Sequence, residues 1–526
     1  MLVLRLTGIA LLVSIAWFIP WLALNMARDQ IWLAVPFLLC NLILAFNLCL
    51  MVVNNWERRT PPPRTVELGA EPLIGVLIPT AGEPVEMVMR TVRSVLEQDW
   101  PRDRLRIVVS DDGHDPQLRR AVRALAEADP HLRIQYNDPP PRDRRRGTAK
   151  AGNLNSALAA LTTAFPDEQI HFIETRDADD MVGDAQFLRR VVGHLLSDPK
   201  TAYVQTIKDA RVREGDPFNN RELIFYREVM QAKHAANAVF PCGSGLVWRA
   251  EALRDIGNFP SWNLVEDLHS GVEALRRGWR GAFVPVVGAL AQHAPHDIPN
   301  VYKQRGTWAM DTARLLVHGD LRGLKPRQYA QFLEMALYYV QGAAIIVLGA
   351  IAVWWLLFDA HPVVVLPAEY ALHFIPFIVA SEVYFIAFTG RQPYSAWWRI
   401  REMMFGLAPV FARTFAQAVI AGRDRKPVYR VTRKTDQFLW YWRETLPQML
   451  MVAIVVGAVA FALLARDVIE PLSLGGLYFI ALLVIYGAGF VRKGWYGVPA
   501  GPIGYLRRHY EEGRQASGGT EPSPWR

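Results

Sequence analysis

Cysteine is scarce in this 526-residue chain, which contains only Cys40, Cys49 and Cys242. Three cysteines, two of them in one apolar run, can build neither a disulfide framework nor a zinc cluster. Charged residues are also sparse, at 21% of the chain against 51% apolar residues. That balance, with no short repeat, excludes disordered and fibrous proteins. The net charge of +8 is modest, and cytoplasmic loops of a membrane protein explain it more simply than a nucleic-acid partner does, so no nucleic acid is expected.

The charges that do occur are concentrated between about residues 58 and 327, and long apolar stretches flank that block. Six stretches are long enough to cross a hydrocarbon core of about 30 Å; they are residues 6–24, 31–53, 335–358, 363–388, 447–465 and 472–491. A cleaved signal peptide is the alternative for the first stretch, but its apolar run is too long and lacks a clear small-residue cleavage site. The sequence therefore predicts an integral membrane protein with a polar block between its spans.

The cations near the predicted spans indicate their orientation. The presumed outer connections carry only Arg28 and Arg466. The presumed inner connections carry Arg5, Arg58, Arg59, Arg64, Arg391, Arg492 and Lys493. Because cytoplasmic loops are enriched in Lys and Arg, we expect both termini and the polar block to lie in the cytoplasm.

Residues 395–420 carry a helical stripe of apolar side chains, but Arg399, Arg401, Pro409 and Arg413 would sit badly in lipid. We interpret this stretch as an amphipathic helix lying in the membrane interface. The alternative is a seventh span, which would put the C-terminus outside.

Several polar groups fall inside the predicted spans, and intramembrane carboxylates are costly unless they face a partner or a polar cavity. They are Asn41, Asn47, Gln341, Glu369, His373 and Glu382. Each one alone is explained as well by an interhelical hydrogen bond. Together they suggest a polar path through the bundle.

The polar block alternates short apolar strands, at residues 74–78, 105–110 and 170–174, with helical stretches at 85–96 and 118–128. This alternation predicts an α/β fold, a parallel sheet with helices on both faces. Ligands of such sheets bind at the carboxyl ends of the strands. Acidic clusters follow two of these strand ends, so we expect them to converge.

The acidic clusters and a basic loop together suggest a nucleotide and a metal ion. Two carboxylates spaced as Asp177 and Asp179 suit a hard divalent cation, although a solvated turn is the common meaning of this spacing. Arginines at 142 and 144–146 precede Lys150 and Asn153, and a helix is expected at 154–161. A basic, small-residue loop before a helix is typical of a phosphate cradle. A solvated charge run explains the arginines equally well, but explains Lys150 to Asn153 poorly.

Seven motifs occur in a fixed order along the chain. They are Thr80 with Glu83, Asp111-Asp112-Gly113, Lys150-Ala151-Gly152-Asn153-Leu154-Asn155, Asp177-Ala178-Asp179, Val204-Gln205-Thr206, Phe240-Pro241-Cys242-Gly243-Ser244 and Glu266-Asp267. In this order they resemble the processive family-2 glycosyltransferases of the bacterial cellulose synthase catalytic subunit type. The predicted spans fit too, and Tyr429-Arg430-Val431-Thr432-Arg433-Lys434 resembles the F-x-V-T-x-K gating loop of those enzymes, with Tyr for Phe.

The resemblance implies a cytoplasmic GT-A-like glycosyltransferase domain at residues 70–327, inserted in an α-helical transmembrane bundle of about six spans plus interfacial helices. The remaining segments would be two spans in 1–57, two in 328–390, an interfacial helix and gating loop in 391–440, two spans in 441–493 and a short cytoplasmic tail in 494–526.

The resemblance also implies a role for each motif residue. Thr80, Glu83 and Asp111 would hold the uracil and ribose of a UDP-sugar, and Lys150 and Asn153 would meet its diphosphate. Asp177 would contact the nucleotide and, with Asp179, hold Mg²⁺ or Mn²⁺. Asp267, next to Glu266, would be the general base. The acceptor would contact Phe240, Cys242, Gly243, Ser244, Gln304 and Trp308, and the donor would be covered by Thr432 and Lys434.

Three positions depart from the family pattern. Ala81-Gly82 replaces a usual Tyr-Asn, and Val265 replaces a usual Thr before Glu266. The Q-x-x-R-W motif ends on Thr307-Trp308, so its diphosphate-binding arginine is missing. Lys303 lies four residues before Thr307 on the same helix face, and we expect it to supply the missing charge. Arg305 should point away, and the arginine run at 142–146 is the alternative source.

The function implied is an inverting, UDP-sugar-dependent β-glycan synthase, with a cellulose-like β-glucan as the first choice. It would elongate and translocate its polymer across a bacterial-type inner or plasma membrane. Its partners would be the UDP-sugar, the growing polysaccharide, membrane lipid and accessory export subunits. The alternatives are a single transfer to a lipid acceptor, a hyaluronan- or chitin-type synthase using UDP-N-acetylglucosamine, and a non-catalytic nucleotide-sugar sensor or scaffold.

Overall fold

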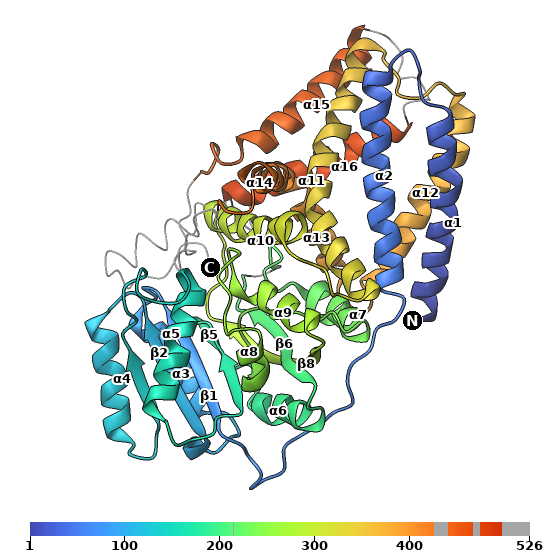
Figure 1. The fold of residues 1–526 in the computed structure, drawn as a ribbon. Helices are drawn as coiled ribbons and strands as arrows, with labels where there is room; N and C mark the ends of the chain where they lie inside the picture. Colours follow the sequence, from blue (N-terminus) through green and yellow to red (C-terminus); the bar gives the residue numbers. More distant parts are fainter. Residues whose placement is uncertain (214, 426–439, 466–473, 497–526) are drawn as a thin grey trace, which may run out of the picture.

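The structure is a computed structural model that describes the 526-residue chain except residues 214, 426–439, 466–473 and 497–526. Figure 1 shows an α/β domain below a helical bundle, and the bundle takes helices from both sides of that domain in the sequence. The domain lies between helices α2 (Ile31–Asn54) and α11 (Pro326–Phe358). This arrangement confirms the predicted insertion of an α/β domain in a bundle.

The domain is built on one eight-stranded sheet with the order β3-β2-β1-β4-β7-β6-β8-β5. Its strands are β1 (Ile74–Thr80), β2 (Leu105–Asp111), β3 (Ile134–Asn137), β4 (Phe172–Thr175), β5 (Asp180–Met181), β6 (Thr201–Ala210), β7 (Leu246–Arg249) and β8 (Arg280–Ala291). β1 pairs in parallel with β2 and β4, in a register that places Thr80 opposite Asp111. The two predicted acidic strand ends therefore lie on one edge of the sheet.

The prediction of an all-parallel sheet is wrong for the second half. β7 runs antiparallel to both β4 and β6, and β5 runs antiparallel to β8. After β6 the chain passes through residues 211–245 and re-enters the sheet from the same end, so β7 runs antiparallel to β6. β7 begins with a short run of three apolar residues. Such a run does not indicate whether the strand pairs in parallel or antiparallel with its neighbours.

Helices cover both faces of the sheet, as predicted. One core packs α3 (Val85–Leu96), α4 (Pro116–Ala128) and α6 (Phe187–Ser197) against one face. The other core packs α5 (Ala149–Ala164), α8 (Ala250–Asp255) and part of α9 (Glu266–Arg276) against the opposite face. Within β1, Val76 and Ile78 join the first core while Leu77 joins the second. Burial on both sides explains why this strand reads as a continuous apolar run.

Six described helices are long and apolar enough to cross a membrane, which confirms the six predicted spans. They are α1 (Leu2–Leu24), α2, α11, α12 (Pro367–Phe388), α15 (Leu446–Ala465) and α16 (Leu474–Tyr496), the last of which qualifies over Gly476–Trp495. The helices are longer than predicted at two ends. α1 begins four residues earlier than expected, and α11 begins at Pro326, so its first turns lie against the α/β domain.

The predicted single interfacial helix at 395–420 is two helices, α13 (Tyr394–Gly406) and α14 (Ala408–Ala421), which meet at an angle of 57°. Pro409 lies in the first turn of α14 and has no N–H, so one continuous helix would lose a hydrogen bond at this point. α13 packs against α16, while α14 packs against α11 and α10 (Ile298–His318). The bend therefore brings α10, the helix of the Q-x-x-R-W-like motif, under the bundle (Figure 1).

Candidate active site

A single cavity of about 870 Å³ joins the carboxyl-end edge of the sheet to the interior of the bundle. Its cytoplasmic part is lined by residues of the predicted donor and base motifs, among them Thr80, Lys150, Asp177 and Asp267. Its other part is lined by side chains of α2, α11, α12 and α16. The site at the sheet edge and the space between the spans are therefore continuous.

The predicted nucleotide end begins where β1 ends. The Thr80 hydroxyl donates to Glu83 Oε2 at 2.7 Å, and the Ala81 N–H donates to the same oxygen at 2.7 Å. Both Thr80 and Glu83 line the cavity. Asp111 is 1% exposed, and its oxygens accept from the N–H groups of Gly113 and Asp115. Asp111 therefore shapes the loop after β2, while its neighbour Asp112 is the residue that reaches the cavity.

Asn153 joins the two strand ends from the first turns of α5. Its Nδ2 donates to the carbonyl oxygens of Thr80 and Ser110, both at 3.0 Å. Its Oδ1 is buried without a hydrogen-bond partner in the described structure, and the residue lines the cavity. A donor molecule that brings an N–H or O–H group to this place would satisfy that oxygen.

Lys150 lies at the centre of the charged cluster. The sequence placed it in a loop before a helix at 154–161, but α5 begins at Ala149, so Lys150 stands on its first turn. Its Nζ is 2.6 Å from Asp177 Oδ1 and 3.1 Å from Glu266 Oε1. Burial alone would lower the pKa of Lys150, but the carboxylates of Asp177, Glu266 and Asp267 outweigh it and raise the pKa above its ordinary range. Lys150 thus links the predicted metal motif to the predicted base motif.

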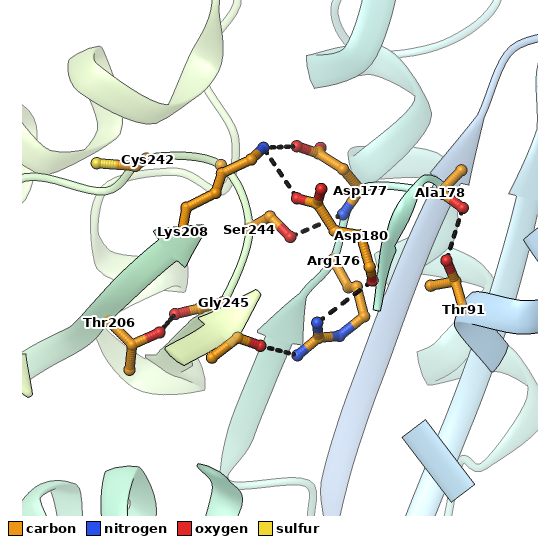
Figure 2. A network of polar contacts seen from close by, with 12 residues as sticks. Thr91, Arg176, Asp177, Ala178, Asp180, Thr206, Lys208, Cys242, Ser244 and Gly245 are labelled. Atoms are coloured by element: carbon orange, nitrogen blue, oxygen red, sulfur yellow. Dashed lines mark hydrogen bonds and ion pairs between the residues drawn. The ribbon is translucent and has the colours of Figure 1, made fainter. Parts of the chain in front are cut away.

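Asp177 is held by a second lysine that the sequence reasoning missed. Lys208 Nζ lies 2.6 Å from Asp177 Oδ2 and 2.9 Å from Asp180 Oδ2 (Figure 2). Burial alone would raise the pKa of Asp177. The charges of Lys150 and Lys208 have the larger opposite effect, so the pKa lies below its ordinary value. The sequence carried little signal for it, because Lys208 is one of several polar residues of β6, two positions after Val204-Gln205-Thr206.

The backbone of the Asp177–Asp180 turn is fixed from below by a buried ion pair. Arg176 and Glu174 are both 0% exposed, and Arg176 Nε donates to Glu174 Oε1 at 2.6 Å. Arg176 also donates to the Gly288 carbonyl at 3.0 Å (Figure 2). On the other side, the Thr91 hydroxyl donates to the Ala178 carbonyl at 2.8 Å. These contacts hold the turn in place without using any carboxylate of the Asp177–Asp179 motif.

The predicted acceptor loop at 240–244 is positioned by the Val-Gln-Thr motif of β6. Gln205 Oε1 accepts from the Cys242 N–H at 2.7 Å, and Gln205 Nε2 donates to the Ser244 carbonyl at 3.0 Å. Phe240 and Cys242 line the cavity. Ser244 is fully buried, and its hydroxyl accepts from the Asp177 N–H at 3.1 Å (Figure 2). Ser244 therefore joins this loop to the metal motif rather than facing the cavity.

Gly243 lies where the side chains of Lys150, Asp177 and Asp267 come together. Its φ of +82° is a conformation that favours glycine. A Cβ placed on it would lie 2.9 Å from Lys150 Nζ and 3.2 Å from Asp267 Oδ2. Only glycine leaves room for this convergence.

Glu266 and Asp267 form the first turn of α9 and open onto the cavity. Burial, together with the charge of Glu266, raises the pKa of Asp267 to about 7. One oxygen of Asp311, on α10, accepts from the N–H groups of Leu264 and Val265 at 2.9 and 3.2 Å. Asp311 thereby fixes the backbone just before the two acidic residues. The sequence analysis did not single out Asp311, although it is a carboxylate one helical turn after Trp308.

The helix α10 carries the remaining predicted residues. Gln304, Thr307 and Trp308 line the cavity, and the Thr307 hydroxyl donates to the carbonyl of Lys303 at 2.7 Å. Arg305 also lines it, with its guanidinium paired to Glu222 and 4.7 Å from the Trp308 ring. The expectation that Arg305 points away is therefore wrong, because its pairing with Glu222 holds it on the same cavity as Thr307, next to Trp308.

Two predicted sources exist for the positive charge that Thr307 cannot supply to the diphosphate, namely Lys303 and the arginine run at 142–146. Lys303 is half-buried, but it is not among the residues that line the cavity in the described part of the chain. Arg142 is exposed and lines the cavity, as Asp112 and Lys150 also do. Its neighbour Arg145 is paired with Asp112. The predicted gating residues Thr432 and Lys434 lie outside the described residues.

Within the bundle the cavity wall includes three of the polar residues expected there, Asn41, Asn47 and Gln341. Glu369 accepts instead from the Trp21 indole at 2.9 Å, and Glu382 accepts from Arg401 at 2.7 Å. The polar path and the interhelical hydrogen bond are therefore both present, in different residues. Aromatic side chains share the wall, among them Tyr338, Tyr339, Trp355, Tyr370, Phe374 and Tyr478.

The acidic turn, residues 177–180, is the predicted metal site. Among the residues that the structure describes, no three His, Cys, Asp or Glu side chains are arranged to hold a metal ion by themselves. Asp177 and Asp179 both line the cavity, and they offer the oxygen ligands that Mg²⁺ and Mn²⁺ prefer. Such ions commonly bind through one or two carboxylates together with phosphate oxygens. The residues fit a cation of this kind.

Comparisons with known proteins agree with this geometry. Residues 71–311 match the family model described as glycosyltransferase like family 2. A putative cellulose synthase 2 of Komagataeibacter xylinus is 28% identical over 421 residues, covering 76% of this chain and 26% of that protein. The cellulose synthase catalytic subunit (UDP-forming) of Pseudomonas fluorescens SBW25 is 28% identical over 417 residues, covering 76% of this chain and 52% of that protein.

A solved structure gives the same fold. A mannosyltransferase of Pyrobaculum calidifontis, in complex with GDP-Man and Mn²⁺, superposes with a TM-score of 0.50 at 19% identity. The superposition covers 73% of this chain and 99% of that one. The α/β domain is therefore a family-2 glycosyltransferase domain with a GT-A-like fold. The chain is similar to these cellulose synthases over 76% of its length, and it spans about a quarter to a half of the length of these relatives.

Proposed function

We propose that this protein is a membrane-embedded, inverting, UDP-sugar-dependent β-glycan synthase that passes its growing polymer into the bundle. A cellulose-like β-glucan made from UDP-glucose is the product we put first. The α/β domain and both termini would face the cytoplasm. The observation that supports this most is the continuity of the cavity, which contains both the Asp267 carboxylate and the side chains of four spanning helices.

In this proposal the donor occupies the cavity between Thr80 and Lys150, and the acceptor sugar stacks on Trp308. Asp267 takes the proton from the acceptor hydroxyl as that oxygen attacks the anomeric carbon. A pKa raised to about 7 suits this role, because the carboxylate is a stronger base than an ordinary aspartate and about half of it is still ionised near neutral pH. Attack opposite to the departing UDP inverts the anomeric configuration.

The chain's own residues would prepare the leaving group. Lys150 stands between Asp177 and Glu266, within reach of a diphosphate placed beside the acidic turn. A divalent cation, Mg²⁺ or Mn²⁺, would be held by Asp179 and Asp177 with the diphosphate, and would offset charge on the departing UDP. Arg142 would add the positive charge that the Thr307 position lacks.

A single transfer to a lipid acceptor is the second candidate, because apolar side chains dominate stretches of the cavity wall inside the bundle. Leu44, Leu48, Ile345 and Leu348 are among them. An acyl or isoprenoid chain would pack against such a wall, whereas a glycan would use the aromatic side chains and the three amides.

The test uses the purified full chain in lipid nanodiscs with radiolabelled UDP-glucose or UDP-N-acetylglucosamine and Mg²⁺ or Mn²⁺. We expect a long water-insoluble product from UDP-glucose that a β-1,4-glucan hydrolase degrades, and no product in excess chelator. An organic-extractable product carrying one sugar would favour the lipid acceptor. No transfer from either donor, in protein that binds UDP, would contradict the proposal.

A further inference from the structure

We propose that Lys208 is a tethered cation that makes binding of the divalent metal depend on the diphosphate of the donor. This inference rests on the proposed function, since it assumes a nucleotide-diphosphate donor and a metal at the acidic turn. Figure 2 shows the arrangement on which it depends, with one ammonium group reaching two carboxylates of that turn.

The balance of charge around the turn depends on two ammonium groups before any ligand arrives, and Lys150, one of the two, is shared with Glu266 and Asp267. Three carboxylates lie together, those of Asp177, Asp179 and Asp180, and two ammonium groups lie among them, those of Lys150 and Lys208. Both oxygens of Asp177 are engaged, Oδ1 by Lys150 and Oδ2 by Lys208, each at 2.6 Å. A metal ion arriving alone would therefore compete with two ammonium groups for Asp177.

A diphosphate changes that balance. It brings negative charge and several phosphate oxygens, the ligands with which Mg²⁺ and Mn²⁺ commonly complete their coordination. The ion can then bind between the diphosphate and the carboxylates of Asp177 and Asp179, while Lys208 remains on Asp180. Metal and donor would thus each raise the affinity of the other, by the same factor.

Lys208 is placed for this electrostatic role more than for a packing role. Its side chain is 27% exposed and lines the cavity, so its removal does not empty a core position. The turn itself is held by the buried Arg176–Glu174 pair, whereas the ion pairs of Lys208 go to Asp177 and Asp180. The charge on Lys208 is secure, because Asp177, Asp180 and Asp179 outweigh the effect of burial and raise its pKa well above the ordinary range.

The experiment measures binding of Mn²⁺ alone to the full chain, from the electron paramagnetic resonance signal of the free ion, and repeats it at saturating UDP. Lys208→Met removes the charge and keeps most of the side chain's length, while Lys208→Arg keeps the charge. Lys200→Met is the matched control, since Lys200 is exposed just before the same strand. Circular dichroism on each variant checks folding.

Without UDP, we expect Lys208→Met to bind Mn²⁺ at least about tenfold more tightly than the wild-type protein, a coupling of ordinary size. Lys208→Arg and Lys200→Met should bind it as the wild-type protein does. Unchanged or weaker binding by folded Lys208→Met would overturn the inference. If the wild-type protein fails to bind UDP even with Mn²⁺, the proposed function fails, whatever the Lys208 variants do.

Discussion

Asp177 and Asp267 are two aspartates on one cavity, both beside Lys150, and their protonation behaviour is opposite. Two lysines hold the pKa of Asp177 below its ordinary value, against the effect of burial. Burial and the charge of Glu266 raise the pKa of Asp267 to about 7, against the effect of Lys150. The comparison shows that neighbouring charges decide which role a buried aspartate can take. Asp177 beside two lysines stays an anion, which suits binding, whereas Asp267 beside Glu266 can take up a proton, which suits a base.

The largest effect we expect comes from Asp267→Asn. The amide keeps the size of the side chain but cannot accept the proton, so turnover should fall by roughly 10²-fold or more. UDP binding, measured by calorimetry, should stay close to that of the wild-type protein. If UDP binding and turnover fall in parallel, the two aspartates share a binding role and the comparison breaks down; Glu266 then becomes the candidate base.

The next effect concerns the support of the base. Asp311→Ala removes the acceptor for the Leu264 and Val265 N–H groups, so the start of α9 should shift and kcat should fall about tenfold. Asp311→Asn keeps an acceptor oxygen and should retain most of the activity. Equal losses in both variants would show that the carboxyl group itself, rather than its hydrogen bonds, is required.

A smaller effect should separate the two candidate cations on the donor side. Arg142→Ala should raise KM for the UDP-sugar by about three- to tenfold, because Arg142 lines the cavity but is exposed and its charge is screened. Arg144→Ala, an exposed residue of the same run that does not line the cavity, is the control. A larger effect of Lys303→Ala would favour the helix-face argument made from the sequence.

The smallest effect is a shift in pH dependence. Since Asp267 must be deprotonated to act, kcat/KM should rise with pH through a midpoint near 7. Glu266→Gln removes a negative neighbour, which lowers the pKa of Asp267, so that midpoint should move by about one unit to lower pH. A midpoint that stays in place, or moves up, would mean that Glu266 does not tune the base.

The sequence was sufficient for features that rest on local pattern. Apolar length predicted the six spanning helices, and alternating strands and helices predicted where β1 and β2 end. The motifs after β1, β2 and β4 then meet at one cavity, because the carboxyl ends of parallel strands share an edge.

Features that depend on contacts between residues far apart in the sequence were not predicted. The direction of β7 depends on where the chain re-enters the sheet, and the bend between α13 and α14 depends on packing against two different sets of helices. Lys208 and Asp311 are ordinary polar residues in the sequence, and only the fold brings them to Asp177 and to the start of α9.

Gly243 has a consequence for engineering. Because a single methyl group at this position would press on Lys150 and Asp267 together, Gly243→Ala alters both halves of the reaction without changing any charge. Such a variant is a steric probe. The substitution also strains the backbone at a φ of +82°, so the loss of turnover measures how far the reaction depends on the geometry of this loop.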